Sequence, residues 1–137
     1  MKPTLKSGIA KKRSFTVDRD STIGFMGEDA RVYATPMLVR DVEITCRDFL
    51  LEHLEPGEDS VGIRVELDHL AATLLGMQVA IEVTLAELKG RAVTFDVVAT
   101  DGVDTICRGR HSRFIANVDQ VKARLKQKQA KAQPQPA

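Results

Sequence analysis

The sequence predicts an α+β domain in which one long helix packs against an antiparallel sheet. An amphipathic segment of helical period follows Thr35, and segments that alternate polar and apolar residues follow from Val61 onward. Short turn signals, Lys89-Gly90 and Asp101-Gly102, separate the later segments. Connections this short join antiparallel strands, and a single amphipathic helix can cover one face of such a sheet.

The helix is predicted to begin with Thr35 as its N-cap and Pro36 in its first turn, and to run to about His53. Before it, we expect a short strand at residues 12–17 and a loop or short irregular helix over 18–34. Five residues form its apolar stripe: Val39, Val42, Cys46, Phe49 and Leu50. Its charged residues, Asp41 among them, are expected to lie mostly outside this stripe.

Four strands are expected after the helix, each with its odd-numbered residues facing the core. The core-facing residues of the first strand are Val61, Ile63, Val65 and Leu67. The next two strands cover about 77–85 and 93–99, and the fourth runs from Val103 to about Ile115. Asn117 can cap a last helix from Val118 to about Gln127. A long helix wrapped by such a sheet is the hotdog arrangement, whose sheets commonly join edge to edge as dimers.

Size and composition limit the possible function classes. The 137 residues fit one domain over 1–127, followed by a Lys/Gln/Pro-rich tail at 128–137 that we expect to be disordered. A formal net charge of +1 leaves no broad basic surface for nucleic acid. No segment approaches the roughly 20 apolar residues of a membrane span, and no signal sequence is evident, so a cytoplasmic protein is expected. Cys46 and Cys107 stand alone, which predicts buried thiols and no metal site.

Three ionisable residues interrupt the apolar pattern. Glu43 lies beside the helical stripe, and one interpretation is a surface ion pair with Arg47 at i+4. His69 continues the core-facing side of its strand, where a hydrogen-bonded core histidine is the simpler interpretation. Arg113 shares the core-facing side of the fourth strand, where a rim arginine with its head in water is the alternative. His111, two residues before it, is expected to have no functional role.

A carboxylate, an imidazole and a guanidinium from three elements can also converge on one site. Burial raises the pKa of a carboxyl group, whereas a nearby cation lowers it. Three such residues can therefore be poised for proton transfer near neutral pH. Thr35 adds a hydroxyl, and backbone N–H groups at the start of the helix can hold an oxyanion. Transfer of an acyl group to water is a natural use of these groups.

Several blocks of the sequence resemble the fluoroacetyl-CoA thioesterase family of hotdog-fold hydrolases. The blocks are Tyr33-Ala-Thr-Pro, Glu43, Leu54-Glu-Pro-Gly-Glu, Val61-Gly, His69-Leu-Ala-Ala-Thr, Gly76, Asp101-Gly-Val-Asp and His111-Ser-Arg. This resemblance implies a catalytic set of Thr35, Glu43 and His69, with Gly62 and Arg113 lining the site. It further implies a homodimer that holds an acyl-CoA thioester at the subunit interface, without a separate cofactor.

The resemblance therefore predicts an acyl-CoA thioesterase that releases a free acid and CoA. Fluoroacetate-specific members carry an aromatic lid from a longer segment before the helix, whereas residues 18–34 here hold only Phe25 and Tyr33. This difference predicts a broader, short-chain acyl specificity. The alternative is a hotdog module that binds acyl-CoA or another small ligand without catalysis.

Overall fold

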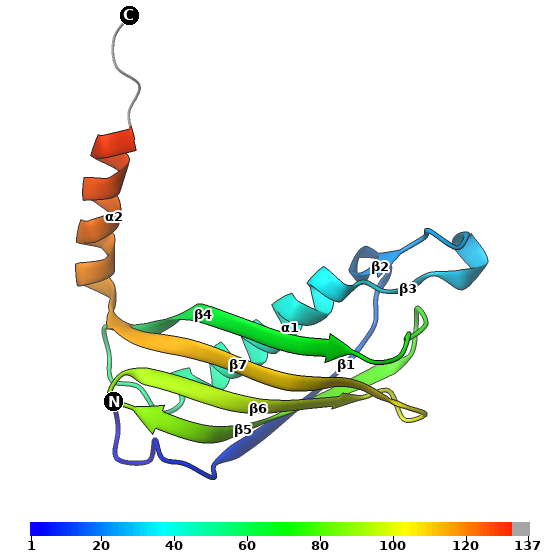
Figure 1. Ribbon diagram of the computed structural model, residues 1–137, viewed down its shortest axis with the longest axis horizontal. Helices are drawn as coiled ribbons and strands as arrows, with labels where there is room; N and C mark the ends of the chain where they lie inside the picture. The colour runs from blue at the N-terminus through cyan, green and yellow to red at the C-terminus, as the bar shows by residue number, and fades with distance from the viewer. Residues whose placement is uncertain (133–137) are drawn as a thin grey trace, which may run out of the picture.

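One long helix crosses a five-stranded antiparallel sheet in the computed structural model, which describes residues 1–132 (Figure 1). The sheet holds the five longer strands, and the two short ones pair with each other before the helix. The elements in chain order are β1 (Ala10–Thr16), the 3₁₀ turns Arg19–Ser21 and Glu28–Ala30 around β2 (Thr22–Ile23), β3 (Val32–Tyr33), α1 (Thr35–Leu51), β4 (Glu58–His69), β5 (Gln78–Lys89), β6 (Ala92–Thr100), β7 (Thr105–Asn117) and α2 (Val118–Ala132).

The strand order in the sheet is β1-β5-β6-β7-β4, with every neighbouring pair antiparallel. Short connections link β5 to β6 and β6 to β7, as the Lys89-Gly90 and Asp101-Gly102 signals predicted. β4, which follows α1 directly, lies at one edge of the sheet. The α+β class and the hotdog arrangement predicted from the sequence are confirmed.

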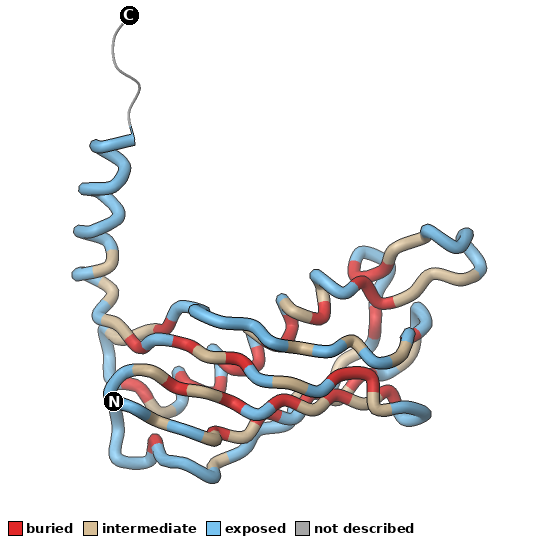
Figure 2. The backbone as a smooth tube through the Cα atoms, in the orientation of Figure 1, coloured by how far each residue is buried: buried red, intermediate tan, exposed pale blue. Residues whose placement is uncertain are grey.

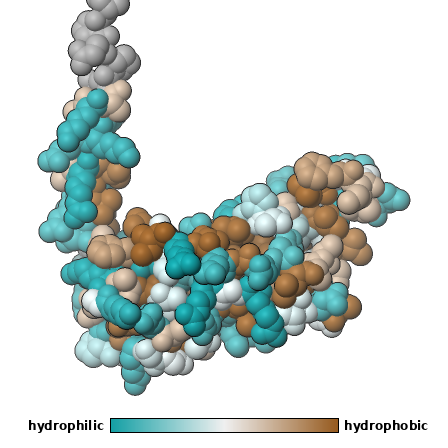
Figure 3. All heavy atoms as spheres, in the orientation of Figure 1, coloured by the Kyte–Doolittle hydropathy of each residue, from teal (hydrophilic) through white to brown (hydrophobic). Residues whose placement is uncertain are grey.

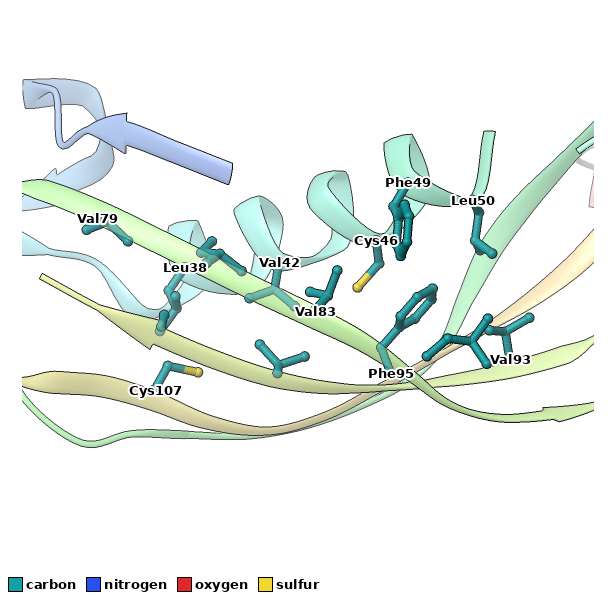
Figure 4. Close-up of a cluster of buried hydrophobic side chains, with 14 of the residues drawn as sticks. Leu38, Val42, Cys46, Phe49, Leu50, Val79, Val83, Val93, Phe95 and Cys107 are labelled. Carbon is teal, nitrogen blue, oxygen red and sulfur yellow. The ribbon is translucent and has the colours of Figure 1, made fainter. Parts of the chain in front are cut away.

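The core lies between α1 and the inner face of the sheet (Figures 2 and 4). β5 and β6 alternate buried and partly exposed residues as predicted. Across the layer, Phe49 of α1 and Phe95 of β6 bring their ring centroids to 6.2 Å. The buried face of α1 differs from prediction in three places: Leu38 is buried where Val39 was expected, Asp41 lies inside rather than outside, and Thr45 is buried as well. Both predicted thiols, Cys46 and Cys107, are buried and free.

The predicted orientation of β4 is wrong at its start. A β-bulge between Gly62 and Arg64 shifts the register against β7, leaving Ile63 without a partner. Before the bulge, Gly62 pairs with buried Arg113, whereas Val61 pairs with Phe114, which is 40% exposed. Paired residues share a face of a sheet, so Gly62 points inward and Val61 outward. The extra residue returns the odd-numbered positions from Val65 to His69 to the inner face, as predicted. Of these, Leu67 packs against the core, whereas Val65 is 43% exposed.

α2 begins where expected, with the Asn117 side chain accepting a hydrogen bond from the Gln120 N–H at 3.1 Å. The helix extends through Ala132, beyond the predicted end near Gln127, and none of its residues is buried. It projects away from the sheet in Figure 1. The rest of the expected disordered tail, 133–137, lies outside the described residues. Within 1–132, no helix combines the length and apolar character needed to cross a membrane.

Candidate active site

Thr35 and His69 form a hydrogen-bonded pair at the start of α1. Thr35 was predicted to cap the helix, but Ala34 holds the N-cap position and Thr35 is the first helical residue. Its hydroxyl oxygen instead lies 2.8 Å from Nδ1 of His69, at the end of β4. The helix start also offers fewer donors than expected, because Pro36 has no N–H and the Met37 N–H donates to the Ala34 carbonyl.

The second ring nitrogen of His69 has no partner within the described chain. Among residues 1–132, Nε2 of His69 is buried and has no hydrogen-bond partner. Burial lowers the pKa of this imidazole, so the ring is neutral near pH 7. An open cleft of about 310 Å³ adjoins it, lined by Thr35, Ile23, Leu70 and Ala71 among others. A neutral imidazole beside a cleft, held at one nitrogen by a hydroxyl, can give or take a proton at the other.

Arg113 is buried rather than placed at the rim. Its side chain is only 5% exposed, while that of Glu43 is 42% exposed. Arg113 Nη1 and Glu43 Oε2 lie 3.5 Å apart, which pairs the two residues as opposite charges. The alternative partner of Glu43 is excluded, because Arg47 forms two hydrogen bonds with the Asp59 carboxylate. The Glu43 carboxylate is therefore held near one buried cation and remains half open to solvent.

Gly62 brings the backbone of β4 next to this ion pair. A Cβ atom at Gly62 would lie 3.0 Å from Glu43 Oε2 and 3.5 Å from Arg113 Nη1. It would also lie 3.3 Å from Cε1 of His111, which is fully buried. Glu43, Gly62 and Arg113 thus meet in one place. His111 belongs to the same cluster, although the sequence analysis gave it no role.

Within one chain, the predicted residues form two groups rather than one. Thr35 and Glu43 are eight residues apart on α1, which separates them by about 12 Å along the helix axis. In residues 1–132, no hydrogen bond or ion pair joins Glu43 to His69 or to Thr35. One group therefore offers a hydroxyl and an imidazole beside a cleft, and the other a carboxylate beside a buried guanidinium.

Ser60 is a site residue that the sequence analysis missed. Its hydroxyl and carbonyl oxygens accept hydrogen bonds from Arg113 Nε at 2.7 Å and Nη2 at 2.9 Å. Ser60 occupies the inner face of β4 because it precedes the bulge, so the odd-numbered pattern concealed it. A serine in the even-numbered set carries no sequence signal of its own.

Tyr33 and Asp41 were missed for a related reason. The Tyr33 hydroxyl donates to Asp41 Oδ2, and both residues are buried. The Tyr33 ring meets the His69 ring edge to face at 6.3 Å. Acidic residues are common on the solvent-exposed face of the first turns of a helix. The position of Asp41 in the sequence therefore did not indicate that it is buried and hydrogen-bonded to Tyr33. The pair supports one wall beside His69.

A family model and a characterised relative match most of this chain. The family model described as fluoroacetyl-CoA-specific thioesterase matches residues 17–119. A fluoroacetyl-CoA thioesterase from Streptantibioticus cattleyicolor is 31% identical over 135 residues, covering 93% of this chain and 97% of the relative.

Two solved structures share the fold over most of their length. A point mutant of the fluoroacetyl-CoA-specific thioesterase FlK, in complex with fluoroacetate and CoA, is 30% identical with a TM-score of 0.79, covering 85% of this chain and 99% of its own. A thioesterase superfamily member from Thermus thermophilus is 29% identical with a TM-score of 0.85, covering 94% and 96%. These matches favour the predicted hydrolase over the non-catalytic binding module. The chain is a hotdog-fold thioester hydrolase and belongs to the fluoroacetyl-CoA-specific thioesterase family.

Proposed function

We propose that this protein hydrolyses short-chain acyl-CoA thioesters with Thr35, Glu43 and His69. The observation that carries the proposal is the neutral His69 imidazole, held at Nδ1 by Thr35 and unpaired at buried Nε2 beside a cleft. The matched relatives act on a thioester of a two-carbon acid, and one neighbour is a complex with fluoroacetate and CoA. These names support CoA thioesters of small acids as the substrate class.

In the proposed reaction, a C–O bond to the acyl carbon replaces its C–S bond. Glu43 either attacks the thioester carbonyl or positions the attacking water. His69 takes a proton from water and gives a proton to the departing thiolate of CoA. The oxygen of water therefore ends in the free acid, and the CoA thiol gains a proton. The Thr35 hydroxyl orients the imidazole, while Gly62 and Arg113 line the acyl side of the site.

The separation of the two groups within one chain supports a homodimer. β4 is an edge strand, and three of its apolar residues are 43–55% exposed: Val61, Ile63 and Val65. Figure 3 shows apolar surface along this edge, beside the base of α2. Edge strands with exposed apolar residues readily pair with another chain. We therefore propose that β4 pairs antiparallel with β4 of a second copy.

The register of this pairing follows from the residues that must meet. A two-fold axis through the middle of the segment from Gly62 to His69 places His69 opposite Gly62 of the partner subunit. Both residues face inward, and opposite residues in neighbouring strands lie about 5 Å apart. Because Gly62 adjoins Glu43, each proposed site takes Thr35 and His69 from one subunit and Glu43 from the other.

A thiol-release assay tests the proposed chemistry. Purified protein should free CoA from acetyl-CoA, and Glu43→Gln and His69→Ala should each reduce kcat/KM at least about 10²-fold, the low end of acid–base contributions. Matched controls outside both groups and outside β4 are Glu87→Gln on β5, which pairs with Lys89, and His53→Ala after α1, whose ring contacts Thr4. Rates near wild type in both site variants would overturn the mechanism.

Complementation tests the proposed interface site. In dimers formed randomly by co-expressing Glu43→Gln and His69→Ala chains, half are mixed, and one of the two sites in each mixed dimer is intact. Activity should then return to about a quarter of wild type, far above either parent. Activity that stays at the parental level would place both residues in the same subunit and overturn the shared site, while leaving the hydrolysis itself intact.

Substrate range is tested by the same assay across acyl lengths, with fluoroacetyl-CoA included. In the segment 18–34, Phe25 is 86% exposed and Tyr33 is buried, so the segment offers one free aromatic ring. We propose that acetyl-, propionyl- and fluoroacetyl-CoA are all hydrolysed, with kcat/KM values within about 200-fold of one another, since one methylene changes discrimination by roughly 10–200-fold. Hydrolysis confined to the fluorinated ester would contradict this range.

A further inference from the structure

His111 is a buried histidine that the proposed mechanism does not use. It lies on the inner face of β7 and is 0% exposed. Its Nδ1 is 2.8 Å from the backbone oxygen of Arg64, directly after the β4 bulge. Its Nε2 is 3.2 Å from Nη1 of Arg113. Both ring nitrogens are therefore engaged inside the cluster that contains Glu43.

These two contacts determine where the ring proton lies. A carbonyl oxygen only accepts hydrogen bonds, so Nδ1 of His111 carries the hydrogen that reaches Arg64. A guanidinium only donates, so Nε2 carries no hydrogen and accepts from Arg113. The geometry thus requires the neutral Nδ1–H tautomer. Burial, with a smaller effect from Arg113, lowers the pKa of His111, which agrees with a neutral ring.

The contacts of Arg113 show how Nε2 of His111 helps to orient the guanidinium. A guanidinium has five N–H donors, and Ser60 takes one from Nε and one from Nη2. His111 takes one from Nη1, the atom nearest to Glu43. The distance from Nη1 to Glu43 Oε2 is 3.5 Å, longer than a charge-assisted hydrogen bond of about 2.7–2.9 Å. The sheet therefore holds the guanidinium at three points, and Glu43 keeps the ion pair without a short hydrogen bond.

We propose that His111 is a positioning residue, which acts through Arg113 to keep the Glu43 carboxylate free for reaction. The bulge at Ile63 contributes by presenting the Arg64 carbonyl to Nδ1, so the acceptor side of the ring faces Arg113. Without an acceptor at the Nε2 position, the guanidinium can shift so that Nη1 closes on the Glu43 carboxylate and donates a short hydrogen bond to it. This proposal rests on the proposed function of Glu43 and extends it to a residue outside the predicted catalytic set.

Two substitutions of His111 test the contacts of its two ring nitrogens separately. The amide of His111→Asn can replace the Nδ1 donor but does not reach the Nε2 position. The longer amide of His111→Gln can place its oxygen at the Nε2 position and accept from Arg113. We expect His111→Gln to keep kcat/KM within about threefold of wild type and His111→Asn to lose at least about tenfold, mainly in kcat, because orienting partners typically contribute about 10–100-fold.

A purely structural role predicts a different pattern. The kcat/KM of each variant would then depend on its free energy of unfolding, measured with urea. The more stable of the two variants would be the more active one, whether or not its side chain can accept a hydrogen bond from Arg113. Equal activity in both variants, or an order opposite to the expected one, would overturn the positioning role.

A spectroscopic measurement tests the tautomer in the unmodified protein. With ¹⁵N-labelled histidine, long-range proton–nitrogen correlation at pH 7 should show that His111, one of the three histidines, carries hydrogen on Nδ1 and has a bare Nε2. His111→Gln assigns this signal by its disappearance. A hydrogen on Nε2 of His111 would overturn the inference. Because this result does not depend on activity, it is separable from a failure of the proposed hydrolysis, which the wild-type thiol-release assay detects.

Discussion

Gly62 brings the backbone of β4 close to the Glu43 carboxylate. A Cβ here would lie 3.0 Å from Oε2, so a neighbour must move by a few tenths of an ångström. The carboxylate ends a flexible side chain and is the group most able to move. We therefore expect Gly62→Ala to fold normally but to lose at least about tenfold in kcat/KM, since small misplacements of reacting groups are costly. Thiol release and thermal unfolding check this pair of outcomes, and wild-type activity in the folded variant would contradict it.

Tyr33 provides a second test at the scale of one side chain. Burial and the neighbouring Asp41 raise the pKa of the Tyr33 hydroxyl, which donates to that carboxylate. Tyr33→Phe leaves Asp41 Oδ2 without this donor, so we expect a loss of about 1–3 kcal/mol in the free energy of unfolding. Urea unfolding measures it. The double variant with Asp41→Asn should lose less than the sum of the single variants, and additive losses would contradict a direct interaction.

The sequence made some site residues recognisable but not their partners. Glu43, His69 and Arg113 stand out because each interrupts an apolar period, which is a local property of the chain. The ion pair of Glu43 joins residues 70 positions apart, and the nearer Arg47 was an equally plausible partner until the structure placed it on Asp59. His111 was dismissed because nothing local shows that a bulge will offer it a carbonyl.

At the scale of elements, regular strands were predictable and the irregular strand was not. β5 and β6 have two neighbours each, and over the predicted ranges 77–85 and 93–99 their buried residues keep the period of two. The register shift of β5 comes after this range, between Leu85 and Glu87. β4 follows the same pattern in sequence, but its bulge reverses the orientation of the first residues. Alternation identifies a strand, whereas the extra residue depends on pairing with β7 and has no local signal.

The exposed edge of β4 gives the prediction for this scale. Ile63 is 55% exposed in one chain and would be covered in the proposed dimer. Ile63→Asp should therefore weaken the dimer at least about tenfold, because it places a charge in an apolar interface. Val103→Asp is the matched control, since Val103 is 78% exposed in the connection between β6 and β7. Sedimentation velocity over a range of concentrations distinguishes them, and equal dissociation of both variants would contradict an interface at β4.

At the scale of the whole molecule, one sheet face supports both the core and the buried polar cluster. Apolar residues of β5, β6 and α1 fill the centre, while Arg113, His111 and Ser60 are buried toward the edge strand. Buried polar groups are tolerated when they are hydrogen-bonded, and each of these three has a partner. Burial lowers the pKa of His111 in this cluster and that of His69 beside the cleft, which makes stability depend on pH.

This dependence has a definite sign. Burial lowers the pKa values of His69 and His111 below 6.5 in the folded protein, so the unfolded chain binds more protons as the pH falls through that value. The free energy of unfolding should be greatest above pH 6.5 and decline as the pH falls toward the folded pKa values. At lower pH, a further loss follows as Asp59 and Asp101 protonate, because hydrogen bonds from Arg47 and from the Asp104 and Val103 N–H groups, respectively, lower their pKa values.

Urea unfolding at pH 7.5, 6.5, 5.5 and 5.0, at one protein concentration, measures this decline. His111→Gln removes one of the two buried imidazoles, so its loss of stability between pH 6.5 and 5.0 should be smaller than that of the wild type. Below pH 4.5 the two proteins should lose stability in parallel, since both keep Asp59 and Asp101. A wild-type stability that is constant from pH 7.5 to 5.0, or a decline of equal size in His111→Gln, would contradict a histidine origin.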